Sequence, residues 1–196
     1  MKKNKNTIII IAAVAIIALW AISTYNGLVT AEERVSAQWA NVESQYQRRA
    51  DLIPNLVATV RGYAAHESET LEGVVAARAR ATQITVNPDN LTPERLQEFQ
   101  AAQGELSSAL GRLMMITENY PDLKANQNFL QLQAQLEGTE NRIAVERQRF
   151  NEEVRKFNTM VRSFPRNIMV SIVGGFEEKP NFQAEAGASQ APRVEF

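Results

Sequence analysis

Two clusters of polar residues lie on stretches whose apolar residues recur with helical spacing, and these clusters have the clearest potential for chemistry. The segment from Arg48 to Asn55 places Arg49 where the spacing of its neighbours requires an apolar side chain. The segment from Gly138 to Arg142 brings Glu140 near the apolar seam of another helix. A charge that faces a helical core costs several kcal/mol unless it is paired. The clusters therefore predict an ion pair inside a bundle.

We predict a buried polar layer composed of Arg49, Asn55, Gln103 and Glu140. In this layer Arg49 pairs with Glu140, and Asn55 or Gln103 completes the hydrogen bonds. Polar layers of this kind fix the register and the choice of partner in bundled helices. The alternative is that the same residues turn outward to solvent on slightly rotated helices.

Residues for catalysis or metal binding are scarce. The chain has no cysteine and a single histidine, His66, which excludes a thiolate nucleophile and a multi-histidine metal site. His66-Glu67 begins like a zinc-protease motif, but Thr70 occupies the position of the second histidine. No Gly-x-Ser-x-Gly elbow or phosphate-binding glycine loop is present. We therefore expect no catalytic residue, no metal and no cofactor, and we read the scattered carboxylates as solvated helix faces.

Long helices are expected to position the polar layer. Apolar residues recur at spacings of four and three from Val35 onward, which predicts a bundled helix that continues from Ala31 to Gln83. Pro54 lies inside it and is expected to kink it, because proline removes one backbone hydrogen bond.

Two further long helices and a short one are predicted. Thr92-Pro93 reads as the cap and first residue of the second long helix, which ends at Tyr120-Pro121. The third runs from about Asp122 to Ser163. Residues 167–173 form a short fourth helix that is expected to cover the open end of the bundle. The predicted fold class is all-α: an N-terminal transmembrane helix and an antiparallel up-and-down bundle of three long helices and one short one.

The N-terminal segment has the length and composition of a membrane anchor. Residues 7–25 carry no charge and approach the ~20 residues that span a bilayer. The anchor residues that we single out are aliphatic or interfacial aromatic: Ile8, Ile11, Val14, Ile17, Trp20 and Tyr25. Lys2, Lys3 and Lys5 precede the span, so residues 1–6 are expected in the cytoplasm and the bundle outside the inner membrane. The alternative is a signal peptide that is cleaved at Ala21-Ile22-Ser23. Two features argue against cleavage: the apolar run is long for a signal peptide, and helical spacing resumes soon after it.

The remaining chain divides simply. Residues 26–183 form the predicted bundle, and residues 184–196 are rich in Ala, Gly, Ser, Gln and Pro and are predicted to be a disordered tail. The formal net charge of -1 argues against a nucleic-acid partner.

Several strings resemble the LemA family. The most specific are Asp51-Leu52-Ile53-Pro54-Asn55-Leu56 and Gly138-Thr139-Glu140-Asn141-Arg142, and related segments extend to about Phe182. The resemblance implies a bacterial membrane protein with one N-terminal transmembrane segment, an antiparallel four-helix bundle and no catalytic residues. Family descriptions sometimes place the N-terminus outside the cell, whereas the lysines here favour the cytoplasm.

The expected function is that of a membrane-anchored scaffold that contacts membrane lipid and acts through helix–helix contacts, with self-association into a homo-oligomer. The alternative is an adaptor or regulator of another envelope protein, such as a stress-related membrane protease. A hydrolase would require a role for His66 or a specific carboxylate. A sensor would have to signal through a partner, because about six residues precede the span.

Overall fold

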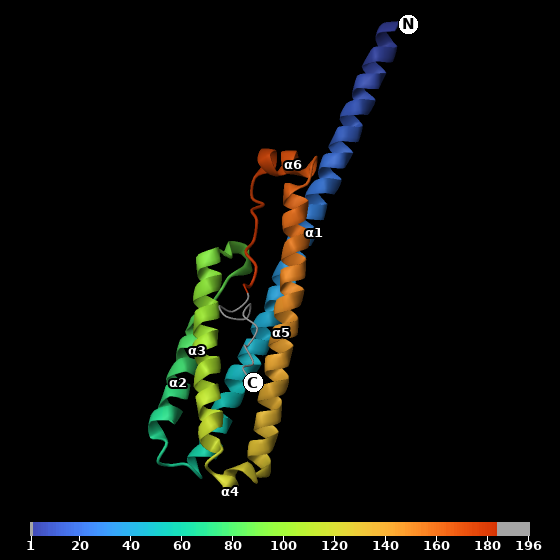
Figure 1. Ribbon diagram of the computed structural model, residues 1–196. Helices are drawn as coiled ribbons and strands as arrows, with labels where there is room; N and C mark the ends of the chain where they lie inside the picture. Colours follow the sequence, from blue (N-terminus) through green and yellow to red (C-terminus); the bar gives the residue numbers. More distant parts are fainter. Residues whose placement is uncertain (1, 184–196) are drawn as a thin grey trace, which may run out of the picture.

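The structure is a computed structural model that describes residues 2–183, and it consists of helices joined by short loops (Figure 1). The predicted tail, 184–196, lies outside the described residues. No strand occurs within residues 2–183, and the predicted all-α bundle with one long apolar N-terminal helix is confirmed. The elements in chain order are α1 (Lys2–Arg61), α2 (Ser68–Gln83), the 3-10 turn η1 (Pro88–Asn90), α3 (Pro93–Thr117), α4 (Pro121–Lys124), α5 (Gln127–Arg162) and α6 (Arg166–Val173).

Helix α1 is one uninterrupted helix of 60 residues. At 1.5 Å per residue it is about 90 Å long. Its apolar first part projects from the bundle, and its second part runs to the far end of the molecule (Figure 1). Side chains become buried from Thr24 and Leu28 onward. The apolar N-terminal segment and the bundle therefore share a single continuous helix.

The predicted continuous helix over residues 31–83 is wrong, because α1 ends at Arg61 and the chain folds back into α2. The backbone N–H groups of Tyr63 and Ala64 both donate to the Val60 carbonyl and close the turn. Folding back lets the apolar face of α2, with Leu71 and Val74, pack on α1, where both side chains are at most 1% exposed. A straight continuation would have left that face in water.

The main helices run up and down in two adjacent pairs. Helix α5 packs along α1, α3 packs along α2, and α1 joins the pairs through α2 (Figure 1). Thr92 accepts a hydrogen bond from the Arg95 N–H at 3.3 Å, which confirms the predicted cap of α3. The predicted third helix is divided by Asn126, whose side chain accepts from the Phe129 N–H and begins α5.

The apolar core consists of two clusters stacked along the bundle. The cluster near the anchor is rich in aromatic rings and includes Trp39, Phe99 and Phe150. The cluster at the far end is aliphatic apart from Phe129 and includes Leu106. The boundary between them falls at the level of Arg49 on α1, since Tyr46 belongs to the first cluster and Ile53 to the second.

Pro54 lies on an exposed side of α1, and the helix continues through it. The kink predicted there stays a prediction. The proline has no N–H for the carbonyl of Ala50, four residues earlier. Arg78 of α2 supplies the missing donor, with its Nε 2.7 Å from the Ala50 oxygen. The proline thus creates an acceptor on α1 that fixes the position of α2.

We predict that Arg78→Met lowers the free energy of unfolding by about 1.5 kcal/mol, the value of a hydrogen bond from a charged group. In a Pro54→Ala background the cost falls, because the substituted alanine returns an N–H to the Ala50 carbonyl. Denaturant unfolding of the full-length chain in mild detergent, followed by circular dichroism, measures both costs. Arg80→Met, on an exposed part of α2, is the control. Equal costs of Arg78→Met in the two backgrounds would contradict this account of Pro54.

Candidate functional site

The predicted polar layer has Arg49 at its centre, and Arg49 is only 1% exposed. One terminal nitrogen, Nη1, donates to Glu140 Oε1 at 2.7 Å and to Ser107 Oγ at 2.8 Å. The other, Nη2, donates to the Gln103 side-chain oxygen at 2.6 Å and to the Gln103 carbonyl at 3.3 Å. The guanidinium also lies 5.2 Å from the centre of the Tyr46 ring. The structure therefore brings Arg49, Gln103 and Glu140 together in one layer.

Asn55 does not belong to this layer. It lies six residues beyond Arg49, and a helix rotates by about 240° net over that distance, so its side chain faces solvent. Ser107 of α3 takes the place proposed for Asn55. Ser107 lies one helical turn after Gln103, a spacing that places both side chains on one face of α3.

The layer adds polar links between the helices of the two pairs. Arg49 projects from α1 to α3, through Gln103 and Ser107, and to α5, through Glu140. Gln103 also donates to the Ala81 carbonyl at the end of α2, at 3.1 Å. Arg49 and Gln103 together thus link α1, α2, α3 and α5 by hydrogen bonds, at the boundary between the two apolar clusters.

The layer is bordered by a small hollow and by the Tyr46 ring. The hollow beside it holds about 80 Å³, and the Arg49 Nε has no hydrogen-bond partner within residues 2–183. Burial raises the pKa of the Tyr46 hydroxyl, and the charges of Arg147 and Arg49 oppose that rise.

An extended segment after α6 seals the open side of the bundle. We call residues 174–183 the strap, which descends between α3 and α5 (Figure 1). Asn151 holds it by two hydrogen bonds to the Phe182 backbone, at 3.0 and 2.8 Å. Asn158 does the same for Lys179, at 2.8 and 2.9 Å. The strap could not be predicted from the sequence, because no periodicity marks a segment whose backbone is held by side chains.

Aromatic rings attach the strap to the core. The Phe182 ring lies 5.8 Å from Trp39 and 5.4 Å from Phe150. The guanidinium carbon of Arg147 lies 4.8 Å from the centre of the Phe182 ring. Buried Lys179 pairs with Glu32 of α1 at 2.9 Å, so the strap also binds the helix that carries the anchor.

The remaining residues singled out in the sequence are His66 and the anchor residues. His66 is exposed in the turn between α1 and α2. Among residues 2–183, no group of three or more His, Cys, Asp or Glu side chains is arranged to hold a metal. The predicted anchor residues are exposed, from 37% for Trp20 to 65% for Ile8. In the described chain this segment is the one helical stretch long and apolar enough to cross a membrane.

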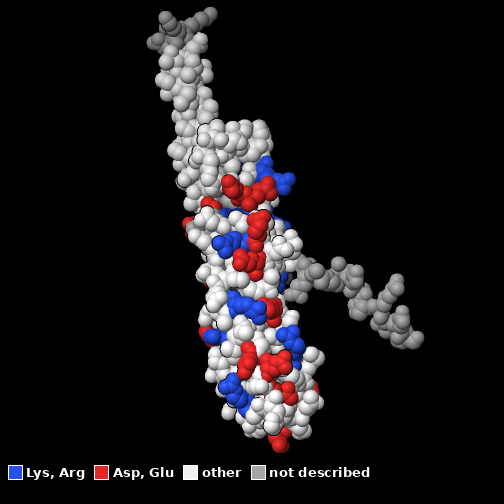
Figure 2. All heavy atoms as spheres, turned by 90° about the vertical axis from the view of Figure 1, so that its left-hand side faces the viewer, with Lys and Arg blue, Asp and Glu red and all other residues white. Residues whose placement is uncertain are grey.

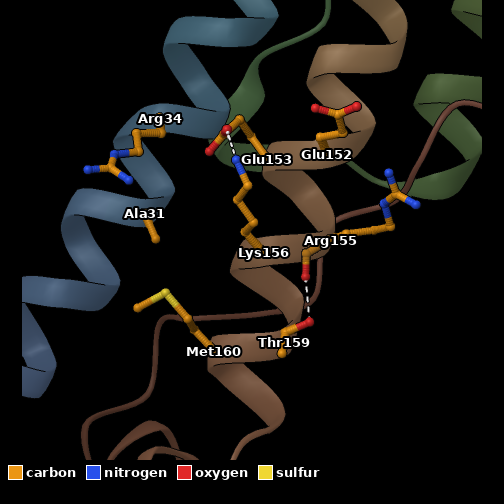
Figure 3. A pocket seen from close by; sticks show the side chains of 8 residues that line it. All are labelled: Ala31, Arg34, Glu152, Glu153, Arg155, Lys156, Thr159 and Met160. Carbon is orange, nitrogen blue, oxygen red and sulfur yellow. Dashed lines mark hydrogen bonds and ion pairs between the residues drawn. The ribbon is translucent and has the colours of Figure 1, made fainter.

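A groove of about 670 Å³ follows the contact between α1 and α5, close to the anchor (Figure 3). Ala31 and Met160 face the gap between the two helices. We call this hollow the α1–α5 groove. Its charged residues include Arg34 on α1 and the Glu153–Lys156 ion pair on α5, which has a 2.6 Å separation. Arg34 has no ion pair within residues 2–183.

These features define an all-α bundle carried on an apolar N-terminal helix that suggests a single-pass membrane anchor. The family model for the LemA family matches residues 38–196, and the chain belongs to this family.

Curated relatives extend the similarity toward the N-terminus. The chain is 26% identical over 206 residues to the magnetosome protein MamQ of Magnetospirillum gryphiswaldense, covering 91% of this chain and 76% of the relative. It is also 26% identical to magnetosome protein MamQ 1 of Paramagnetospirillum magneticum, with 89% and 73% covered. Protein LemA of Metamycoplasma hominis is 24% identical over 139 residues, with 71% and 60% covered.

Proposed function

We propose that this protein is a single-pass membrane-anchored scaffold of the bacterial envelope, which self-associates through helix–helix contacts. The anchor crosses the inner membrane with residues 1–6 in the cytoplasm and the bundle outside, as the lysines before the span favour. The observation that carries the proposal is the continuity of α1 from the span to the far end of the bundle. This continuity keeps the bundle of every copy at a similar height above the membrane.

The α1–α5 groove is the surface best suited to a second copy. The anchor confines copies to one plane and to one orientation, which raises their effective concentration. Grooves of two copies then lie at equal height and can face each other about a two-fold axis along the membrane normal. In that arrangement the unpaired Arg34 of one copy meets the Glu152 and Glu153 carboxylates of the other. Ala31 and Met160 supply the apolar centre.

We predict that Ala31→Trp converts a homo-oligomer of the full-length chain into monomers, because the indole fills the groove. Ala40→Trp is the matched control: Ala40 is exposed on the same helix, and about two and a half turns after Ala31 it faces the opposite side. Native mass spectrometry of both variants and the unsubstituted chain in mild detergent provides the comparison. If both variants keep the mass of the unsubstituted oligomer, the groove is not the interface.

The second candidate function is that of an adaptor or regulator of another envelope protein. If the unsubstituted chain is monomeric, the α1–α5 groove is free to bind such a partner. The partner would then contribute the helix that fills the groove. A stoichiometric complex with a different membrane protein, lost in Ala31→Trp and kept in Ala40→Trp, would select this candidate over self-assembly.

A further inference from the structure

Helix α6 was predicted to cover the open end of the bundle, and this role stays a prediction. None of its residues is buried. Val170 is half-buried against the aromatic cluster of the core. On the other side, Ile168 and Ile172 are 46% and 74% exposed. Their spacing of four places them on one face of the helix, which has no partner within residues 2–183.

Two neighbouring apolar residues are exposed as well. Phe164, just before the helix, is 80% exposed, and Val173, at its end, is 50% exposed. Exposed apolar residues are common when they occur singly, but a group of four on one short segment requires an explanation. We call Phe164, Ile168, Ile172 and Val173 the α6 apolar patch.

The position of α6 indicates what covers the patch. The helix lies beside α1 where the projecting anchor meets the bundle, and it runs across the direction of α1 (Figure 1). The Tyr25 ring, at the end of the predicted span, lies 5.7 Å from Phe176, three residues after α6. On the face shown in Figure 2, the anchor and the adjoining end of the bundle form an uncharged surface, and the charged side chains begin below it.

We propose that the α6 apolar patch is a second membrane contact, which lies in the bilayer interface beside the anchor. A short helix that lies in the membrane plane buries its apolar face at the boundary between headgroups and acyl chains. The end of the span brings α6 to that depth, and α6 runs in the direction that such burial requires. Arg166, the first residue of α6, is exposed and can extend its charge toward the lipid phosphates. The occupant is therefore lipid, because the patch continues the apolar surface of the anchor.

The contact would also fix the tilt of the bundle. A single span permits the domain to rotate and tilt, whereas two separate membrane contacts on one rigid body restrict both motions. This inference does not depend on self-association, since it concerns each copy alone.

Depth-dependent quenching tests the proposal. The chain contains no cysteine, so Ile172→Cys provides a single site for an environment-sensitive fluorophore. Met115→Cys is the matched control, because Met115 is 67% exposed and lies in the last turn of α3. That end of α3 adjoins α4, away from the projecting part of α1 (Figure 1). The full-length variants are reconstituted into phosphatidylcholine vesicles that contain a fraction of lipid with nitroxide-labelled acyl chains.

We expect the label at position 172 to be quenched several-fold more than the label at position 115, with a blue-shifted emission. A label at Val173→Cys should lose this quenching when Ile168 and Ile172 are both replaced by glutamate. Equal, weak quenching at positions 172 and 115 would overturn the proposal. Quenching at position 172 by nitroxide-labelled protein, without quenching by nitroxide-labelled lipid, would overturn it as well, because a second copy would then cover the patch.

Discussion

Replacing Arg49 by methionine lowers the free energy of unfolding by about 3 kcal/mol, the lower end of the range for breaking a buried charge pair. The substitution keeps much of the side-chain volume but removes four hydrogen bonds. The side-chain oxygen of Gln103, which is 7% exposed, then has no donor. The lower end applies because the Glu140 side chain is 41% exposed and regains water when its partner is lost.

Denaturant unfolding of the full-length chain in mild detergent measures this loss. Arg48→Met is the control, since Arg48 is the exposed neighbour on the same helix and should change stability by less than about 0.5 kcal/mol. A double-mutant cycle with Glu140→Gln isolates the ion pair and should give a coupling energy of about 1 kcal/mol. A coupling energy of zero would show that the pair contributes nothing beyond the other hydrogen bonds.

Replacing Phe182 by alanine detaches the strap and lowers the free energy of unfolding by about 3 kcal/mol, as expected for truncating a buried aromatic ring. Phe182 is 6% exposed and contacts Trp39, Phe150 and Arg147. We expect the strap to be released before the whole bundle unfolds. The strap is extended and is held by hydrogen bonds from two asparagine side chains, not by a helix of its own.

Tryptophan emission distinguishes local release from global unfolding. The chain has two tryptophans, so Trp20→Phe leaves Trp39, beneath the strap, as the sole reporter. In Phe182→Ala the Trp39 emission should shift to the red while the helical circular dichroism is unchanged. The control is Asn181→Ala, an exposed neighbour in the strap that should leave the emission unaltered. Unaltered emission in Phe182→Ala would contradict the packing of Phe182 on Trp39.

The sequence was most informative where a residue broke a strong periodic pattern. Arg49 and Gln103 stood out because each interrupts an apolar seam, and Glu140 because it lies beside one. Ser107 carried no such signal, since a serine on a helix is ordinarily a solvated residue. Asn55 was included because it is close to Arg49 in sequence, but helical rotation turns it away.

Features that depend on tertiary packing could not be predicted in the same way. The composition of the chain remains helical past Arg61 and does not mark the turn there. The turn is favoured by the free energy of packing α2 on α1, which the sequence pattern does not reveal. The strap has no periodicity, and its position depends on asparagine side chains far away in sequence. The outward face of α6 required the structure, because an apolar octet does not reveal which of its sides the bundle covers.

Cross-linking in native membranes tests the central claim of self-association most directly. Single cysteines replace Ala31 or Met160 in the α1–α5 groove, and the control cysteines replace Ala40 and Met115 outside it. A short bismaleimide is then added to membranes that contain the full-length chain. We predict covalent dimers at the two groove positions and monomers at both controls. Monomers at all four positions, or dimers at the controls alone, would contradict a scaffold that assembles through this groove.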